Sequence, residues 1–452
     1  MKEDGMTQKR ISRRSFLAGA TTTVAVWGEA ANRGPTGKRR VSPSDKLNIA
    51  GIGVGGRGAY DIANLSEGSN IVALCDVDEK QAAGTLNRFP NAKKYRDFRR
   101  MLEEEKNIDA VVVATPDHIH AVASMAAIKL GKHVYCEKPL THSVYEAREL
   151  ARAAREAGVA TQMGNQGHSM EGIRRCCEMI RSGAIGPVRE YHAWTHSPVW
   201  PQGIRRPTEK PPVPDWLDWD LWLGPAPERP YHPAYLPVNW RGWWDFGNGA
   251  LGDMGCHIID PAYWALKLGA PISVEAVSQE GCNEETAPTR EVIRWEFPQH
   301  GEMCPVTVYW YDGGNKYPRP EGVSDEEELG DPGGKQGGLF YGDKGAMTVG
   351  HHGEAPRLLP KEKMRGYVMP QQRIPRVPDE NHFQNWVAAC KGGPPACSNF
   401  DYASRLTETV LLGAIAGRVP GKLEWNSEEM RFMNNNEANR YLRRAHRKGW
   451  SL

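Results

Sequence analysis

A short apolar run followed by closely spaced glycines constrains the fold of this chain more than any other feature. Residues 47–58 read LNIAGIGVGGRG, and a helix is expected over 59–65. The spacing Gly53-x-Gly55-x-x-Gly58 is typical of a dinucleotide-binding turn. The first glycine allows the tight turn, the second lets the backbone approach a pyrophosphate, and the third lets helix and strand pack closely. The free N–H groups at the helix N-terminus would then face the phosphates.

Two alternatives to this interpretation exist. The spacing Gly51-x-Gly53-x-x-Gly56 also fits, but it would begin the turn inside the strand, so we prefer the later register. An ordinary strand-to-helix turn, without any nucleotide, is the second alternative, because glycine-rich turns are common. The glycines therefore need support from the segments that follow.

Those segments alternate between buried strands and helices. Apolar runs at 70–76, 108–114, 133–136 and 160–163 alternate with helical patterns at 81–89, 97–105, 121–130 and 145–157. Such alternation predicts βαβ units and a doubly wound parallel sheet. Ligands bind such sheets at the carboxyl ends of the strands, so residues at those ends should surround one crevice.

Asp76 ends the second predicted strand, 18 residues after Gly58. A carboxylate at this position can accept both ribose hydroxyls of an adenosine and repels a 2′-phosphate. Val77 follows instead of an arginine, which favours NAD over NADP. Alone, Asp76 could instead cap the helix that starts near Asp78.

The second half of the chain has a different pattern. A helix is expected over 172–182 and a strand over 188–194, followed by an irregular Trp-rich segment, residues 197–249. Short apolar runs at 273–277, 291–297 and 306–311 read as antiparallel strands, residues 338–349 as a hairpin, and 380–391 and 403–417 as helices. Most of the tryptophans should anchor the loop by packing, although a few could stack on sugar rings.

Three polar residues of the chain, Lys138, Asp253 and His257, could carry chemistry. Asp253 and His257 are four residues apart, so on a helix they would project from one face. Alone, they would be a capping Asp and a buried, hydrogen-bonded His, and Lys138 would be a solvated loop lysine. A histidine that titrates near neutral pH can act as a base.

Composition excludes several classes of function. The net charge of +2 and the absence of a basic block give no indication of nucleic-acid binding. The nine cysteines include no C-x-x-C pair, and we expect Cys75, Cys136 and Cys256 to be buried free thiols and the chain to have no metal site. No apolar run is long enough for a transmembrane helix.

The first 45 residues read as an export signal and linker. Arg13 and Arg14 precede Phe16-Leu17 and a short apolar stretch, which is typical of a twin-arginine signal, with cleavage expected after Ala30. A chance arginine pair in a basic tail is the alternative. We predict a periplasmic or otherwise extracytoplasmic protein.

Five ordered motifs together resemble the Gfo/Idh/MocA family of oxidoreductases. They are GVGGRG with LCDVD, then ATPDHIH, CEKPLTHSVYEARELARAA, GNGALGDMGCHIIDPAYWAL, and HFQNWVAACKG with LTETVLLGAIAGR. The resemblance implies a Rossmann domain at 46–163 and an α/β domain at 164–425 with a large, mainly antiparallel sheet. One face of that sheet would cover the nicotinamide, and the opposite face would mediate assembly into a dimer or tetramer. Residues 426–452 would be a polar, peripheral tail.

The resemblance also implies roles for individual residues. Lys138, Asp253 and His257 match the family's catalytic residues, and the Lys138–Pro139 bond is expected to be cis. Chemically, His257 would take the hydroxyl proton, Asp253 would hold its ring, and Lys138 would stabilise the developing alkoxide. The cofactor site would comprise Gly53, Gly55, Gly56, Arg57, Gly58, Asp76, Thr115, Pro116, His120, Glu137 and Lys138. The substrate site would draw on Asn165, Gln166, His192 and His196.

The expected function is oxidation of a hydroxyl of a sugar, polyol or glycoside by hydride transfer to tightly bound NAD. Export from the cytoplasm removes the protein from a free NAD(H) pool, so the cofactor should be resident and the redox cycle closed. An NAD-dependent glycoside hydrolase, which oxidises its substrate transiently, is therefore the main alternative. A sugar-binding relative without activity is the lesser one, disfavoured by the intact Lys138, Asp253 and His257.

Overall fold

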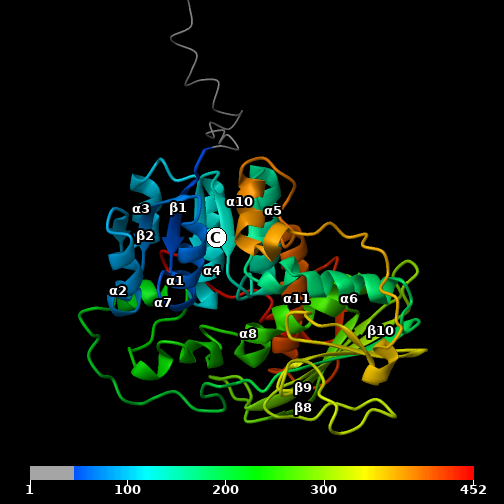
Figure 1. The fold of residues 1–452 in the computed structure, drawn as a ribbon. Coiled ribbons are helices and arrows are strands. Elements are labelled where there is room, and N and C mark those ends of the chain that lie inside the picture. The colour runs from blue at the N-terminus through cyan, green and yellow to red at the C-terminus, as the bar shows by residue number, and fades with distance from the viewer. Residues whose placement is uncertain (1–44) are drawn as a thin grey trace, which may run out of the picture. The chain divides into compact units, whose positions relative to one another are not determined.

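The computed structural model describes residues 45–452, so the expected export signal and its cleavage site lie outside the described residues. Two sheets dominate this part of the chain (Figure 1). The first contains six parallel strands and the second contains nine strands. Among residues 45–452, no helix is both long and apolar enough to cross a membrane.

The six-stranded sheet has the order β3-β2-β1-β4-β5-β6, which is the doubly wound order of a Rossmann fold. Every neighbouring pair in it is parallel, as predicted. Its strands are β1 (Asn48–Ile52), β2 (Asn70–Cys75), β3 (Lys93–Tyr95), β4 (Ala110–Val113), β5 (His133–Cys136) and β6 (Thr161–Met163). Its helices are α1 (Gly56–Leu65), α2 (Glu79–Arg88), α3 (Phe98–Glu104), α4 (Asp117–Lys129) and α5 (Val144–Ala157). The sequence did not predict β3, which is short and polar.

Burial explains why these strands form one sheet. Strand β4, Ala-Val-Val-Val, is buried along its whole length, because both faces of a parallel sheet are covered by helices. Helix α5 begins with a reciprocal capping box between Ser143 and Glu146 and ends at Gly158, whose φ of 58° suits the left-handed C-cap.

The nine-stranded sheet has the order β13-β12-β11-β7-β10-β9-β8-β14-β15. Only β7 and β10 pair in parallel, so the expected mainly antiparallel sheet is confirmed. Its strands are β7 (Val188–Trp194), β8 (Ser273–Glu280), β9 (Arg290–Phe297), β10 (Val306–Tyr311), β11 (Gly337–Gly342), β12 (Gly345–Val349), β13 (Arg357–Leu359), β14 (Leu423–Asn426) and β15 (Arg431–Phe432). The predicted hairpin at 338–349 is the β11–β12 pair.

Helices α6, α8 and α11 lie above this second sheet in Figure 1, between it and the Rossmann part. The α-helices of this region are α6 (Glu171–Arg181), α7 (Trp219–Leu223), α8 (Gly249–Ile258), α9 (Asp260–Ala265), α10 (His382–Cys390), α11 (Phe400–Ala416) and α12 (Asn436–Asn439). Short 3-10 helices span Gln166–Ser169, Pro233–Tyr235, Asn239–Gly242, Lys361–Met364 and Pro378–Glu380. One continuous hydrophobic core joins the two sheets through these helices.

The Trp-rich segment forms its own aromatic cluster. Trp219 stacks on Trp222 at 4.8 Å between ring centroids, and Trp243 and Phe246 are fully buried beside them. The segment is joined to the end of β2, because Asp218 N–H donates to Val77 O at 2.9 Å. Packing is thus the main role of these aromatic residues, as expected, and it places the segment over the carboxyl edge of the Rossmann sheet.

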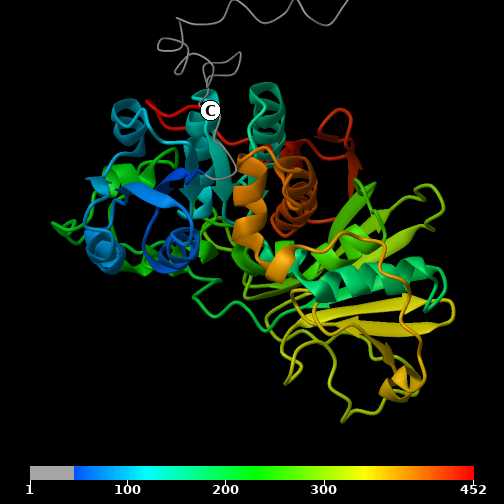
Figure 2. The same ribbon diagram turned by 45° about the horizontal axis from the view of Figure 1, so that its top comes forward.

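The C-terminal residues correct one expectation, since they are not a peripheral tail. Phe432, Ala438 and Leu442 are buried in the main core. Beyond them, Arg444 Nε donates to Glu146 Oε1 at 2.8 Å, which brings the chain back to α5 of the Rossmann part. Figure 2 shows this red segment running back beside the Rossmann helices. Residues 426–452 are mostly polar, so the few apolar residues that anchor them in the core could not be recognised from composition.

All nine cysteines lie within the described residues and are free thiols. Cys75, Cys136 and Cys256 are buried, as predicted.

Candidate active site

A cavity of about 400 Å³ lies at the carboxyl ends of the Rossmann strands, where the sheet topology predicts a ligand. Segments from both halves of the chain line it. From the Rossmann part these include Gly53, Gly55, Gly56, Arg57, Asp76, Thr115, Pro116, Asp117, Glu137 and Lys138. From the rest of the chain they include Gln166, Trp222, Leu236, Pro237, Val238, Trp240, Arg241, His257 and Trp450.

The glycine turn adopts the later of the two registers. Strand β1 ends at Ile52, and Gly53 follows with φ 74°, its N–H donating to Cys75 O at 2.9 Å. A Cβ on Gly58 would lie 1.8 Å from Gly53 O, so only glycine permits this approach of helix and turn. Gly58 therefore packs the turn and does not line the cavity.

The N-terminus of α1 is open to a ligand. Its N-cap is Gly55, and no side chain caps its first N–H groups. Gly56 has φ 48° with open space where a Cβ would point. These two features fit the close approach of a pyrophosphate to backbone N–H groups.

Asp76 lines the cavity and also holds the turn in place. Its Oδ2 accepts the N–H groups of Val54 at 2.8 Å and Gly55 at 3.1 Å, and its Oδ1 accepts the N–H of Asp78 at 2.9 Å. The helix cap of α2 is Asp78, whose Oδ1 accepts the N–H of Gln81, so the capping alternative for Asp76 is wrong. Burial raises the pKa of Asp76, while these N–H donors counteract that rise.

Arg57, Glu137 and Gln166 form a polar group on one wall. Arg57 Nε donates to Glu137 Oε1 at 3.0 Å and its Nη2 donates to Gln166 Oε1 at 3.3 Å. Beneath them the buried Asp61 has a pKa raised well above its usual value, first by burial and then by the nearby Glu137. All three predicted residues therefore line the cavity, and Gln166 belongs beside the cofactor residues.

The predicted place of His120 in the cofactor site is wrong. His120 was expected to line the cofactor site, but it is buried in the first turn of α4 and does not line the cavity. Its ring nitrogens lie 2.8 Å from Pro139 O and 2.8 Å from Thr115 O. It positions the two cavity-lining loops that carry Thr115 and Lys138 and does not face the ligand.

Lys138 lies at the inner end of the cavity, held by an ion pair. Its Nζ donates to Asp253 Oδ1 at 2.7 Å and to Asp253 O at 3.0 Å. Arg241 Nε donates to the same Oδ1 at 3.0 Å. Burial alone would raise the pKa of Asp253, but Lys138 and Arg241 lower it to about 2. The Lys138–Pro139 peptide bond is cis, as expected.

His257 faces the cavity from α8, but its partner differs from the expected one. Asp253 binds Lys138 and Arg241 and makes no hydrogen bond to the ring of His257. The ring packs against His352 instead, at 4.7 Å between centroids, and its Nδ1 is buried without a hydrogen-bond partner. Burial first, and then His352 and Lys138, lower the pKa of His257 well below its usual value, so the ring is neutral at pH 7.

Three of the four predicted substrate residues do not reach the cavity. Asn165 is fully buried, and its Nδ2 donates to Asp260 Oδ2 at 3.0 Å. His192 lies in β7 with Nδ1 3.0 Å from the Tyr311 hydroxyl and Nε2 2.9 Å from Glu190 Oε2. His196 is exposed beyond the end of β7. Only Gln166 lines the cavity.

Several residues that line the cavity were not predicted from the sequence. Asp117 is 4 % exposed, and burial raises its pKa to about 7 although Arg241 and Lys138 counteract the rise. Arg241 packs against Trp240, with its guanidinium carbon 4.3 Å from the ring centroid. Trp450 packs at a tilt against Phe98, with 5.9 Å between the ring centroids. Only Asp117 had a local signal, since it directly follows the predicted Thr115 and Pro116.

Two family models match this chain. Residues 47–165 match the model GFO_IDH_MocA, described as "Oxidoreductase family, NAD-binding Rossmann fold". Residues 190–301 match the model GFO_IDH_MocA_C2, described as "Oxidoreductase family, C-terminal alpha/beta domain". Together the two matches cover slightly more than half of the chain.

Curated relatives are similar over part of their length. A 1,5-anhydro-D-fructose reductase of Ensifer adhaerens is 25% identical over 222 residues, which is 48% of this chain and 55% of that protein. An inositol 2-dehydrogenase of Salmonella paratyphi B is 29% identical over 150 residues, which is 32% of this chain and 44% of that protein. The chain thus spans about half the length of the curated relatives it matches.

Solved structures share the fold. The structure of GenD2 from gentamicin A biosynthesis in complex with NAD aligns with a TM-score of 0.57 at 19% identity, covering 86% of this chain and 99% of that one. At this identity the likeness establishes the two-domain architecture.

Proposed function

Because the chain belongs to the Gfo/Idh/MocA family of oxidoreductases, we propose that it is an NAD-dependent oxidoreductase acting on a hydroxyl of a sugar, polyol or glycoside. One observation carries the proposal. Lys138 follows β5 of the Rossmann part and His257 lies in α8, and both line the same cavity as the glycine turn.

The residues present fit NAD. The uncapped N-terminus of α1 and the open space at Gly56 suit a pyrophosphate. The far end of the cavity is lined by Asp76, Asp78 and Asp97, which would repel the 2′-phosphate of NADP. Arg96 also lies there, but its Nη2 is paired with Glu79 Oε1 at 2.6 Å.

The side chains at the inner end fit oxidation of an alcohol. When bound, NAD supplies the acceptor for the hydride that leaves the substrate carbon. Neutral His257 takes the hydroxyl proton, because burial keeps its ring unprotonated. Lys138 places a positive charge beside the oxygen as negative charge develops on it. Asp253 positions the Lys138 ammonium through its 2.7 Å ion pair and stays ionised.

The first test is a redox assay. The purified full chain is incubated with NAD and a panel of sugars, polyols and aryl glycosides, and NADH absorbance and aglycone release are followed together. We expect NADH formation with at least one sugar or polyol, lost in Lys138→Ala and His257→Gln and kept in the exposed Lys129→Ala. Aglycone without net NADH would establish the hydrolase alternative, and neither signal with any substrate would leave a binding role.

Residence of the cofactor is a separate proposal. We expect the protein to purify with NAD bound at about one molecule per chain, because cavity walls from both halves enclose it. Chromatography of the supernatant after heat denaturation measures this ratio. A cofactor-free protein that binds added NAD reversibly would contradict residence but not the activity.

Export is proposed from the sequence of residues 1–45. Arg13 and Arg14 with Phe16-Leu17 support transport by the twin-arginine pathway to the periplasm or beyond. Cell fractionation of the wild type against Arg13→Lys/Arg14→Lys tests it. Equal amounts of both proteins outside the cytoplasm would contradict this proposal.

A homo-oligomer, dimer or tetramer, is proposed from the family resemblance. The face of the nine-stranded sheet turned away from α6 and α11 is the expected interface, and it carries the tyrosine and histidine side chains around His192. Light scattering during size-exclusion chromatography measures the mass. A monomer at micromolar concentration would contradict the proposal.

A further inference from the structure

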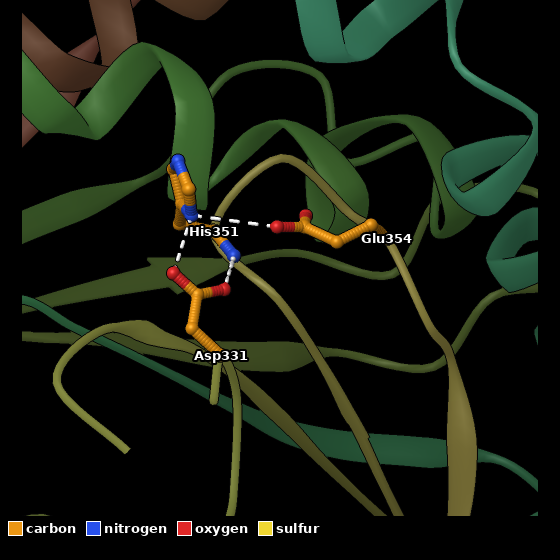
Figure 3. Close-up of side chains that lie close together, drawn as sticks. All are labelled: Asp331, His351 and Glu354. Carbon is orange, nitrogen blue, oxygen red and sulfur yellow. Dashed lines mark hydrogen bonds and ion pairs between the residues drawn. The ribbon is translucent and has the colours of Figure 1, made fainter. Parts of the chain in front are cut away.

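Three polar side chains outside the cavity point toward one another (Figure 3). Asp331 comes from the loop between β10 and β11, and His351 and Glu354 come from the turn between β12 and β13. His351 Nδ1 lies 2.5 Å from Asp331 Oδ2 and 3.4 Å from Glu354 Oε1. One ligand atom from each residue lies within 4.8 Å of the other two.

The backbone holds both carboxylates in this arrangement. Asp331 Oδ1 accepts the N–H of His351 at 2.9 Å, and Glu354 Oε2 accepts the N–H of His352 at 2.7 Å. The Asp331 N–H in turn donates to Gln336 O at 3.0 Å. One oxygen of each carboxylate is therefore fixed to the turn, while the other is directed at the same imidazole nitrogen.

One oxygen of Asp331 and one oxygen of Glu354 compete for the same imidazole nitrogen of His351. A neutral imidazole nitrogen carries at most one proton and can donate it to one acceptor at a time. Within residues 45–452, His351 is the only basic side chain within 4.0 Å of either carboxylate. The Asp331, His351 and Glu354 side chains are 13 %, 22 % and 35 % exposed, so water screens the two charges only in part.

We propose that Asp331, His351 and Glu354 bind a divalent transition-metal ion, Zn²⁺ or Mn²⁺. One imidazole nitrogen and two carboxylate oxygens form a donor set that these ions accept, whereas Mg²⁺ and Ca²⁺ prefer oxygen ligands alone. Bonds of about 2.1 Å in tetrahedral geometry put neighbouring donor atoms about 3.4 Å apart. The His351–Glu354 pair has this separation already, and the His351–Asp331 pair needs to open by less than 1 Å.

Three protein ligands leave at least one coordination position for water, and partial exposure gives the ion a path from solvent. The ion would join the loop before β11 to the turn after β12. The adjacent ring of His352 lies 3.9 Å from the His351 ring and 4.7 Å from the His257 ring, between centroids. The metal would therefore fix the turn that packs against the proposed base. Its binding does not depend on the proposed redox activity.

Metal content and affinity test the proposal on the full-length protein. The chain is stripped with EDTA, dialysed, and titrated with ZnCl₂ or MnCl₂ by calorimetry, and bound metal is counted by mass spectrometry. We expect about one ion per chain and a higher melting temperature with metal. Asp331→Asn and Glu354→Gln, which keep the side-chain shape, should weaken binding by at least about 10- to 100-fold.

Asp343→Asn is the matched control, since Asp343 lies in the turn between β11 and β12 and pairs with the exposed Arg189. It should bind metal as the wild type does. Circular dichroism and NAD binding show whether each variant is folded. The proposal is overturned if the wild type binds no ion with either metal, or if folded Asp331→Asn and Glu354→Gln variants bind as tightly as the control.

Discussion

The two halves of the cavity are built in different ways. The cofactor half comprises the glycine turn, Asp76, Thr115-Pro116 and Glu137-Lys138, which follow the neighbouring strands β1, β2, β4 and β5 of one sheet. The catalytic half comprises Arg241 and His257, with His352 packed against His257, and these residues come from separate segments of the second half of the chain. The first depends on local spacing and the second on long-range packing. Mutations in the two halves of the cavity should therefore impair the protein in different ways.

Gly58→Ala should have the largest effect, because it breaks a contact that admits no side chain. The new Cβ would lie 1.8 Å from Gly53 O, so the turn must move. We expect no measurable NAD binding by calorimetry and a free energy of unfolding lower by about 1–3 kcal/mol. Gly84→Ala is the control, since that glycine in α2 has open space around its Cβ position. Normal NAD binding by Gly58→Ala would mean that the turn is not rigid.

Lys138→Ala should have the second-largest effect, because Lys138 connects the two halves of the cavity. It follows strand β5 of the Rossmann sheet and binds Asp253 of α8. We expect kcat to fall by about 10²–10³-fold, the usual cost of removing one group that stabilises a developing oxyanion. The Kd for NAD should change little. Stopped-flow or steady-state NADH formation measures kcat on the best substrate of the panel. A higher KM with an unchanged kcat would instead assign Lys138 to substrate binding.

Asp76→Asn should affect only the cofactor half. The amide keeps one oxygen for the loop N–H groups but loses the charge that holds two of them at 2.8 and 3.1 Å. We expect about a tenfold higher Kd for NAD, consistent with about 1.4 kcal/mol for one charged hydrogen bond, and a smaller preference over NADP. Fluorescence titration with both dinucleotides measures this. An unchanged preference would show that Asp78 or Asp97 selects the cofactor.

Buried histidines in both parts of the chain should make the protein less stable as the pH falls. Burial lowers the pKa of His118 and His352 to about 3, whereas the unfolded chain titrates near 6.5. Between pH 6.5 and 3 the unfolded state therefore binds protons that the folded state does not, so unfolding becomes easier as pH falls. Each such histidine contributes up to about 1.4 kcal/mol per pH unit.

Denaturation of His118→Gln in urea at pH 7.5 and 5.0 isolates this effect. We expect a shallower pH dependence than in the wild type, whereas the exposed His300→Gln should leave it unchanged. An equal slope in both variants would mean that His118 is protonated in the folded protein.

Trp450→Ala should have the smallest effect. The indole covers the edge of the cavity beside Phe98, with the Arg99 guanidinium carbon 4.3 Å from its centroid. We expect a Kd for NAD about two- to fivefold higher, in keeping with about 0.5–1 kcal/mol for an exposed cation–π contact. The same fluorescence titration measures it. A loss of more than about 100-fold would make the C-terminal segment part of the main binding site, since that equals nearly 3 kcal/mol.

The sequence predicted the cofactor half well because its information is local. The register of Gly53, Gly55 and Gly58 was decided by where the strand ends, and the structure agrees. His120 was predicted to line the cavity because it follows a strand, but it lies in the first turn of α4, where successive side chains point in different directions. The short polar strand β3 had no apolar signal to reveal it.

The catalytic half was predicted in part, and strand periodicity explains one error. Side chains alternate between faces along a strand. Tyr191 of β7 reaches Ile258 O at 2.6 Å on the side of α8, so the neighbouring His192 must lie on the other face. The pairing of Asp253 with Arg241 could not be predicted from spacing, because the irregular backbone of residues 239–248 determines where the guanidinium lies.

The return of residues 440–450 to the Rossmann part has a consequence for how the protein matures. Nearly 400 residues separate Gly53 from Trp450. At 5–20 residues per second, a ribosome needs roughly 20–80 s to make that stretch. The glycine turn therefore leaves the ribosome long before the side chain that covers the edge of its pocket exists. A dinucleotide that meets the nascent chain can gain this last contact only after synthesis has passed residue 450.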